Sequence, residues 1–230
     1  MRTLYSYPDL FGVADNNPFG LKVYAFLRLH DLEFQHQHIL DTRMAPRGQL
    51  PYLVDGTTTI GDSDAIIAYL DKQCGLHTDA KLDSEQRNLD LLVRRTLDDL
   101  YWQMSYSRWR DERYWPAFRA ALLETHPEIT AESLERAREY NRLRYHYQGI
   151  GRYEPDEVYA RGIDNLRAAA DLLGEKPFFF GATPGKIDAA LYGFVANIYF
   201  YAIDTPLKRY VSSRPGLVNH CVAIHERVMW

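Results

Sequence analysis

Cysteine is scarce in this sequence, with only Cys74 and Cys221 among 230 residues. Two cysteines in segments that read as helix ends or interiors cannot form the disulfide framework of a small secreted domain. The first residues also lack a long apolar run before a small-residue cleavage site, and no later window approaches the length of a membrane span. We therefore expect a cytoplasmic protein whose cysteines are reduced and structural.

An excess of positive charge is missing as well. Lys and Arg total 27 against 31 Asp and Glu, which gives a formal net charge of -4. This balance offers no electrostatic basis for binding nucleic acid or an anionic membrane. Arginine and tyrosine interleave between Arg136 and Arg152, but the acidic balance favours a solvated helix face there. His36 and His38 have no further ligand of matching spacing beside them, so we predict no metal site.

The first eighty residues alternate between strand and helix patterns. Residues 3–7 and 34–39 have strand character, and a helical pattern follows Asn17-Pro18 between them. Asp55-Gly56 then separates two short strand-like runs, which is typical of a tight hairpin. Asp62 precedes a further helix as a cap residue. The order β-α-β, loop, β-β-α is that of a thioredoxin-like domain.

The pattern changes after Leu76, where helical periodicity replaces almost all strand signal. We predict an α/β thioredoxin-like domain over residues 1–77 and an all-helical domain over residues 83–230. The expected helices of the second part begin at residue 84 and continue at about residues 114–124, 131–147, 155–173, 186–201 and 217–228.

Leu50-Pro51 lies just before a predicted strand, at the position where a thioredoxin-like domain has a cis peptide bond. Such a bond turns the backbone of Leu50 outward, so that its N–H and C=O can pair with an extended thiol-bearing peptide. Most Leu-Pro pairs simply begin a strand in the trans form. The hairpin and the helix start that follow strengthen the binding interpretation here.

Asp62-Ser63 opens a helix, and a helix start offers free N–H groups and a positive partial charge to an anion. The Ser63 hydroxyl can bind a carboxylate of the peptide, and Asp62 an ammonium group. On this tripeptide alone, simple capping by Asp62, Ser63 and Asp64 is the better interpretation. The combination with Leu50-Pro51 reverses that preference.

Asn17-Pro-Phe-Gly20 occupies the place where thioredoxin-like proteins carry two cysteines at the start of the first helix. Without a thiolate here, disulfide exchange at this position is excluded. Asn17 either donates its side-chain amide to the thiol of the bound peptide or only caps the helix. Tyr5 and Tyr7 are rival donors on one face of the first strand, although a core position is the favoured interpretation for both.

Trp102, Tyr106 and Trp109 recur at helical spacing on the first helix of the second part. Aromatic residues at this spacing usually face another helix or a partner subunit, and this is our preferred interpretation. Tyr106 is the exception that we expect to line a pocket for a second substrate.

The segments that contain Asn17, Leu50-Pro51 and Asp62-Ser63 resemble the glutathione S-transferase superfamily, as does Phe178-Phe-Phe-Gly-Ala-Thr-Pro-Gly-Lys-Ile-Asp188. The resemblance covers nearly the whole chain and is strongest to the metaxin and failed-axon-connections branch. The resemblance implies glutathione as co-substrate, and it assigns Leu50, Pro51, Asp62 and Ser63 to its binding. It places Asn17 where the family usually has serine or cysteine, and Gly20 where cysteine is frequent. Gly185 stands where a Ser or Thr cap is usual.

The leading hypothesis is a transferase that binds glutathione and promotes attack of its thiolate, held near Asn17, on a small hydrophobic electrophile beside Tyr106 and Phe19. The resemblance also implies a homodimer. The alternative is a binding or scaffold protein with the transferase fold and no useful turnover, which the metaxin-like relationship allows.

Overall fold

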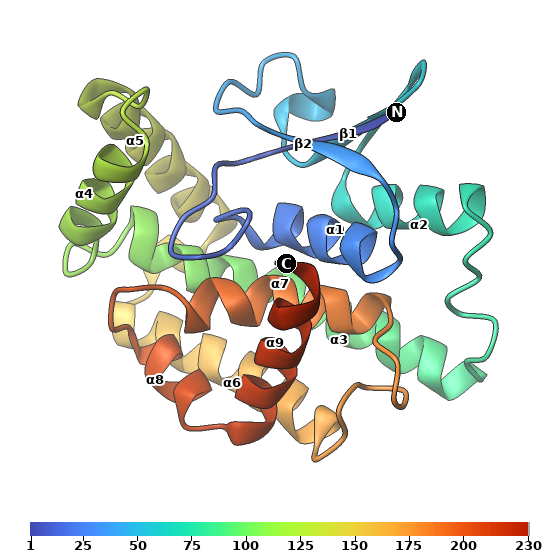
Figure 1. Cartoon of the computed structure of the whole chain (residues 1–230). Helices are drawn as coiled ribbons and strands as arrows, with labels where there is room; N and C mark the ends of the chain where they lie inside the picture. The colour runs from blue at the N-terminus through green and yellow to red at the C-terminus, as the bar shows by residue number, and fades with distance from the viewer. Residues whose placement is uncertain (230) are drawn as a thin grey trace.

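The computed structural model describes residues 1–229 and contains one four-stranded sheet followed by a helical bundle (Figure 1). In order along the chain the elements are β1 (Arg2–Ser6), α1 (Pro18–Leu29), β2 (Phe34–His38), η1 (Pro46–Gly48), β3 (Tyr52–Asp55), β4 (Thr58–Gly61), α2 (Ser63–Gln73), α3 (Ser84–Trp109), α4 (Trp115–Thr125), α5 (Ala131–Gln148), η2 (Ile150–Arg152), α6 (Pro155–Leu173), α7 (Lys186–Tyr199), α8 (Pro206–Ser212) and α9 (Pro215–Val228).

The sheet has the strand order β2-β1-β3-β4, with β1 parallel to β2 and the other pairs antiparallel. Leu4 of β1 pairs with Leu53 of β3, and both side chains are fully buried. α1 and α2 cover one face of this sheet (Figure 1). The predicted thioredoxin-like plan followed by an all-helical part is confirmed.

α1 lies between the sheet and α7, which runs through the centre of the helical bundle (Figure 1). Apolar positions of α1 such as Leu21, Val23 and Phe26 are fully buried. α7 approaches the first turn of α1 closely at Gly193, where a Cβ atom would lie 2.6 Å from the Pro18 carbonyl oxygen. Only glycine permits this crossing, so the start of α1 rests directly on the helical bundle.

Asp188, in the first turn of α7, joins three segments of the helical bundle. Its Oδ2 accepts a hydrogen bond from the Gly185 N–H at 2.8 Å, so the carboxylate reaches back to the cap. Oδ1 accepts from the Phe179 N–H at 2.9 Å and from His220 Nε2 at 3.0 Å. Asp188 is completely buried, so these three donors depend on one carboxylate.

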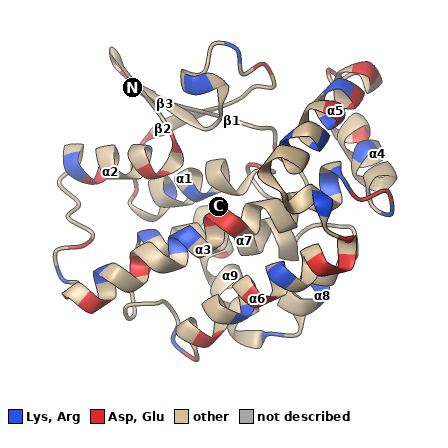
Figure 2. Cartoon of the chain, turned by 180° about the vertical axis from the view of Figure 1, so that it is seen from behind, with Lys and Arg blue, Asp and Glu red and all other residues tan. Residues whose placement is uncertain are grey.

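Charged residues of both signs are interspersed along α3 and α6 (Figure 2). Several of them pair within one helix, as Arg94 does with Asp90 at 2.8 Å. Within residues 1–229, no helix is both long enough and apolar enough to cross a membrane.

Candidate functional site

Asn17 is the residue at which the chain enters α1. Its side-chain oxygen accepts a hydrogen bond from the Phe19 N–H at 3.0 Å, so Asn17 does cap the helix. The cap uses the oxygen alone, and the Asn17 Nδ2 group donates to no described residue. Capping and donation to a ligand are therefore compatible, because they use opposite ends of the same amide.

A fully buried carboxylate lies next to this helix start. Asp15 Oδ1 accepts a hydrogen bond from the Asn17 N–H at 2.7 Å. A Cβ atom at Gly20 would lie 1.6 Å from Asp15 Oδ2, so glycine makes room for the carboxylate. The cysteine that the resemblance leads one to expect at position 20 is thus excluded by Asp15, a residue that the sequence analysis did not single out.

Burial raises the pKa of Asp15 to about 8. Because the folded chain favours the protonated acid, the stability that goes with protonation is present at low pH and is lost as the pH rises from about 4 to about 8. We expect Asp15→Asn to remove this dependence, which amounts to about 4 kcal/mol between pH 5 and pH 8.5. Urea unfolding of both proteins at pH 5 and pH 8.5 measures the difference, with exposed Asp9→Asn as the control. Parallel pH dependences in wild type and Asp15→Asn would contradict the prediction.

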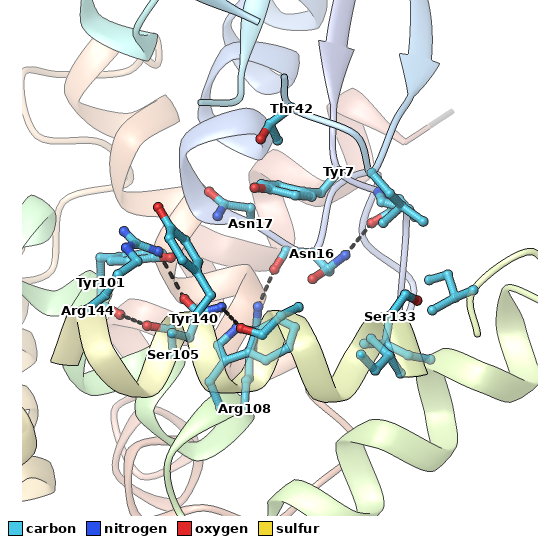
Figure 3. Close-up of a pocket in the computed structure, with 18 residues that line it drawn as sticks. Tyr7, Asn16, Asn17, Thr42, Tyr101, Ser105, Arg108, Ser133, Tyr140 and Arg144 are labelled. Atoms are coloured by element: carbon cyan, nitrogen blue, oxygen red, sulfur yellow. Dashed lines mark hydrogen bonds between the residues drawn. The ribbon is translucent and has the colours of Figure 1, made fainter. Parts of the chain in front are cut away.

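A cavity of about 320 Å³ opens between the start of α1, the end of β1 and the helices α3 and α5 (Figure 3). Asn17, Tyr7 and Thr42 line its upper side, and Tyr101 and Arg144 lie across from them. The Tyr7 ring lies beside the Asn17 side chain in this view. Residues far apart in the sequence thus surround one space in front of the first turn of α1.

Tyr5 and Tyr7 have different environments although both lie at the β1 end. Tyr5 stacks on Tyr52 with ring centroids 4.4 Å apart. Tyr7 lines the cavity instead, and burial raises its pKa to about 12. Its hydroxyl therefore keeps its proton at neutral pH and can donate a hydrogen bond.

The peptide bond between Leu50 and Pro51 is cis, as the sequence analysis predicted. Asp62 has a φ of 81° and accepts hydrogen bonds from the Asp64 and Ala65 N–H groups, both at 3.0 Å. The neighbouring Ser63 side chain is buried, and its hydroxyl has no hydrogen-bond partner among the described residues. These four predicted positions lie outside the wall of the cavity, so glutathione contact by them stays a prediction.

Phe19 and Tyr106 do not line the cavity. The Phe19 ring packs against Tyr101 at 5.2 Å and supports that side chain from behind. Tyr106 is buried against the rings of Tyr145 and Tyr159, at 5.7 and 6.0 Å. Of the aromatic stripe on α3, it is Trp109 that contributes to the cavity wall.

Arg108 of α3 fixes the loop that precedes α1. Its guanidinium donates to the Asn16 carbonyl, and to the backbone and side-chain oxygens of Asn197 at 2.9 and 3.1 Å. Asn197 in turn donates to the Asp15 carbonyl at 3.2 Å. The helical bundle therefore holds the backbone of residues 15 and 16 by hydrogen bonds from α3 and α7.

The sequence interpretation of α5 as an ordinary solvated face is wrong along one side of the helix. Tyr140, Asn141 and Arg144 line the cavity, and the Arg144 guanidinium lies 5.2 Å from the Trp102 ring centroid. The interleaved Arg and Tyr residues are the feature of the sequence that indicates this side of the helix.

The thioredoxin-like sheet followed by a helical bundle is the fold of the glutathione S-transferases. Two family models match the chain, the glutathione S-transferase N-terminal domain over residues 18–114 and the C-terminal domain over residues 162–224. The chain belongs to the glutathione S-transferase family. The first match crosses the predicted domain boundary between residues 77 and 83, so that boundary stays a prediction.

Among particular relatives, the chain is 30% identical to the isoprene-epoxide glutathione S-transferase of Rhodococcus sp. (strain AD45), over 99% of each chain. It is 27% identical to the failed axon connections protein of Drosophila melanogaster, over 94% of this chain and 55% of that protein.

Solved structures support the same fold at low sequence identity. A glutathione S-transferase of Ceriporiopsis subvermispora in complex with glutathione superposes with a TM-score of 0.68 at 16% identity, covering 98% of this chain and 97% of that one. A beta-etherase from Sphingobium sp. strain SYK-6 gives a TM-score of 0.67 at 16% identity, covering 97% and 94%.

Proposed function

We propose that this protein is a glutathione transferase, which promotes attack of the glutathione thiolate on a small electrophile in the cavity before α1. Glutathione binds along Leu50-Pro51 and the start of α2, and its sulfur lies near Asn17. The observation that carries the proposal is the free Asn17 amide, which opens α1 and also lines the cavity. Asn17 thus begins the helix, offers a hydrogen-bond donor and borders the cavity for the substrate.

Activation of the thiol follows from this arrangement. A free thiol has a pKa of about 8.5, and a helix N-terminus stabilises an anion by about 0.5 to 2 kcal/mol. This lowers the pKa by about one unit at most. Hydrogen bonds from the Asn17 amide and the Tyr7 hydroxyl to the sulfur lower it further and make thiolate common at neutral pH.

The electrophile class that we propose to test first is the epoxide, because a relative of nearly equal length is named for one. The thiolate sulfur attacks a ring carbon and forms a C–S bond. The C–O bond of the ring breaks, its electron pair stays on oxygen, and the alkoxide takes a proton from solvent. Positioning and thiolate population supply most of the rate gain.

Ser63→Ala tests the glutathione end of the site. The unpartnered Ser63 hydroxyl is expected to bond the γ-glutamyl carboxylate, so its loss raises KM for glutathione about 10-fold and leaves kcat nearly unchanged. Ser84→Ala is a matched control, because Ser84 also opens a helix directly after a capping aspartate. Equal KM values for the two variants would remove Ser63 from the site.

The alternative is a binding protein without turnover, and the similarity to the failed axon connections protein keeps it open. Calorimetry at millimolar glutathione together with a broad electrophile panel separates the two. Binding with conjugation supports the transferase, whereas binding without conjugation supports the alternative. The expected homodimer and cytoplasmic location belong to this proposal, and size-exclusion chromatography with light scattering tests the first.

A further inference from the structure

The wall of the cavity is positively charged, although the whole chain carries a net charge of -4. Two arginines, Arg108 and Arg144, contribute to it, and no Asp, Glu, Lys or His is among its lining residues. A half-enclosed space with guanidinium groups and no carboxylate attracts negatively charged ligands.

The two arginines differ in how their charge is compensated. Arg108 is buried and donates to three oxygens of Asn16 and Asn197, so its guanidinium is occupied in holding the loop before α1. Arg144 is half-buried and donates to Asn141 Oδ1 at 3.0 Å. It forms no ion pair with any Asp or Glu in residues 1–229, whereas most of the other arginines have such a partner.

Aromatic rings fix the position of the Arg144 guanidinium. It lies over Trp102, Tyr140 and Tyr101, with distances to the ring centroids of 5.2, 5.9 and 6.0 Å. Stacked rings hold a guanidinium in place without neutralising it. In Figure 3 the side chain lies beside Tyr101 and Tyr140 at the edge of the cavity.

We propose that the electrophile carries a carboxylate and that Arg144 binds it. This inference rests on the proposed transferase function and specifies its substrate class. The planar guanidinium pairs with the planar carboxylate through two parallel hydrogen bonds. The carboxylate takes no part in the bond changes, because the C–S bond forms and the ring C–O bond breaks as described above. The salt bridge orients the ring carbon toward the sulfur.

Matched pairs of epoxides test the proposal, with a charged and a neutral member of similar shape. Glycidate and glycidamide form a short pair, and para-carboxystyrene oxide and its carboxamide form a longer one. Each enzymatic kcat/KM is divided by the uncatalysed rate constant with glutathione, which removes intrinsic reactivity. We expect wild type to favour the carboxylate of at least one pair about 30-fold, and Arg144→Gln to abolish that preference.

Arg142→Gln is the control variant, because Arg142 lies on the same helix, carries the same charge and does not line the cavity. It should keep the preference within about two-fold of wild type. Arg144→Lys should retain part of the preference, because the charge remains and the planar pairing is lost.

Three results would overturn the inference. Equal efficiency of wild type toward both members of both pairs would show that the carboxylate is not recognised, and would leave the transferase function intact. If Arg144→Gln lowers kcat/KM equally for charged and neutral epoxides, Arg144 acts on the thiolate or the alkoxide instead. A rise in KM for glutathione alone would assign it to the glycine carboxylate of glutathione. Conjugation of no electrophile by wild type would overturn the proposed function itself.

Discussion

Asn17→Asp is expected to lower kcat/KM for glutathione conjugation about 100-fold while stability hardly changes. Aspartate caps a helix as well as asparagine does, so the hydrogen bond from the Phe19 N–H is retained. The substitution removes the amide donor and places a negative charge beside the sulfur. Both changes disfavour the thiolate, and the pKa of bound glutathione should rise by at least about one unit.

The thiolate absorbance of the glutathione complex, titrated against pH, measures that change directly. Asn17→Ser is the matched variant, because serine caps the helix and offers a hydroxyl donor, and it should keep most of the activity. If Asn17→Asp conjugates as fast as wild type, the sulfur is not held by Asn17. Tyr7→Phe then becomes the variant to measure, since Tyr7 is the other donor at this end of the cavity.

Asp188→Ala is expected to lower the free energy of unfolding by about 3 to 5 kcal/mol. The carboxylate accepts from Gly185, Phe179 and His220, and its removal leaves all three donors unpartnered in the interior. The loss exceeds that of an ordinary helix cap, because these donors cannot reach water. Urea unfolding followed by circular dichroism measures the change.

Two further variants serve as comparisons for Asp188→Ala. Asp188→Asn retains one acceptor oxygen and should show an intermediate loss. Asp156→Ala removes an exposed carboxylate from the first turn of α6 and should cost less than about 0.5 kcal/mol. A similar small cost for Asp188→Ala would mean that water or a shift of α7 compensates the donors.

Local signals predicted most of the fold. The asparagine before α1 and the proline that begins it, the Asp55-Gly56 turn and the aspartate before α2 each act within a few residues, and the elements they indicate are present. α8 was not predicted, although Thr205-Pro206 supplies a cap and a first residue for it. Its seven residues are too few for helical periodicity to stand out.

The site divides in the same way. Asn17 and the cis bond before Pro51 follow from short motifs. Asp15 and Arg144 could not be found so, because their importance depends on burial and on neighbours from distant segments. A buried carboxylate and a solvated one have the same letter in the sequence, and only the packing of α1 against the bundle distinguishes them.

Gly193 and Arg108 belong to the helical bundle, yet they set the position of the first turn of α1. In the proposed transferase, the half of the chain that selects the electrophile therefore also tunes the nucleophile. A chimera that joins the sheet portion of one relative to the bundle of another would exchange thiol reactivity together with substrate preference. Directed evolution of the bundle alone could then alter the chemistry of a residue that it never replaces.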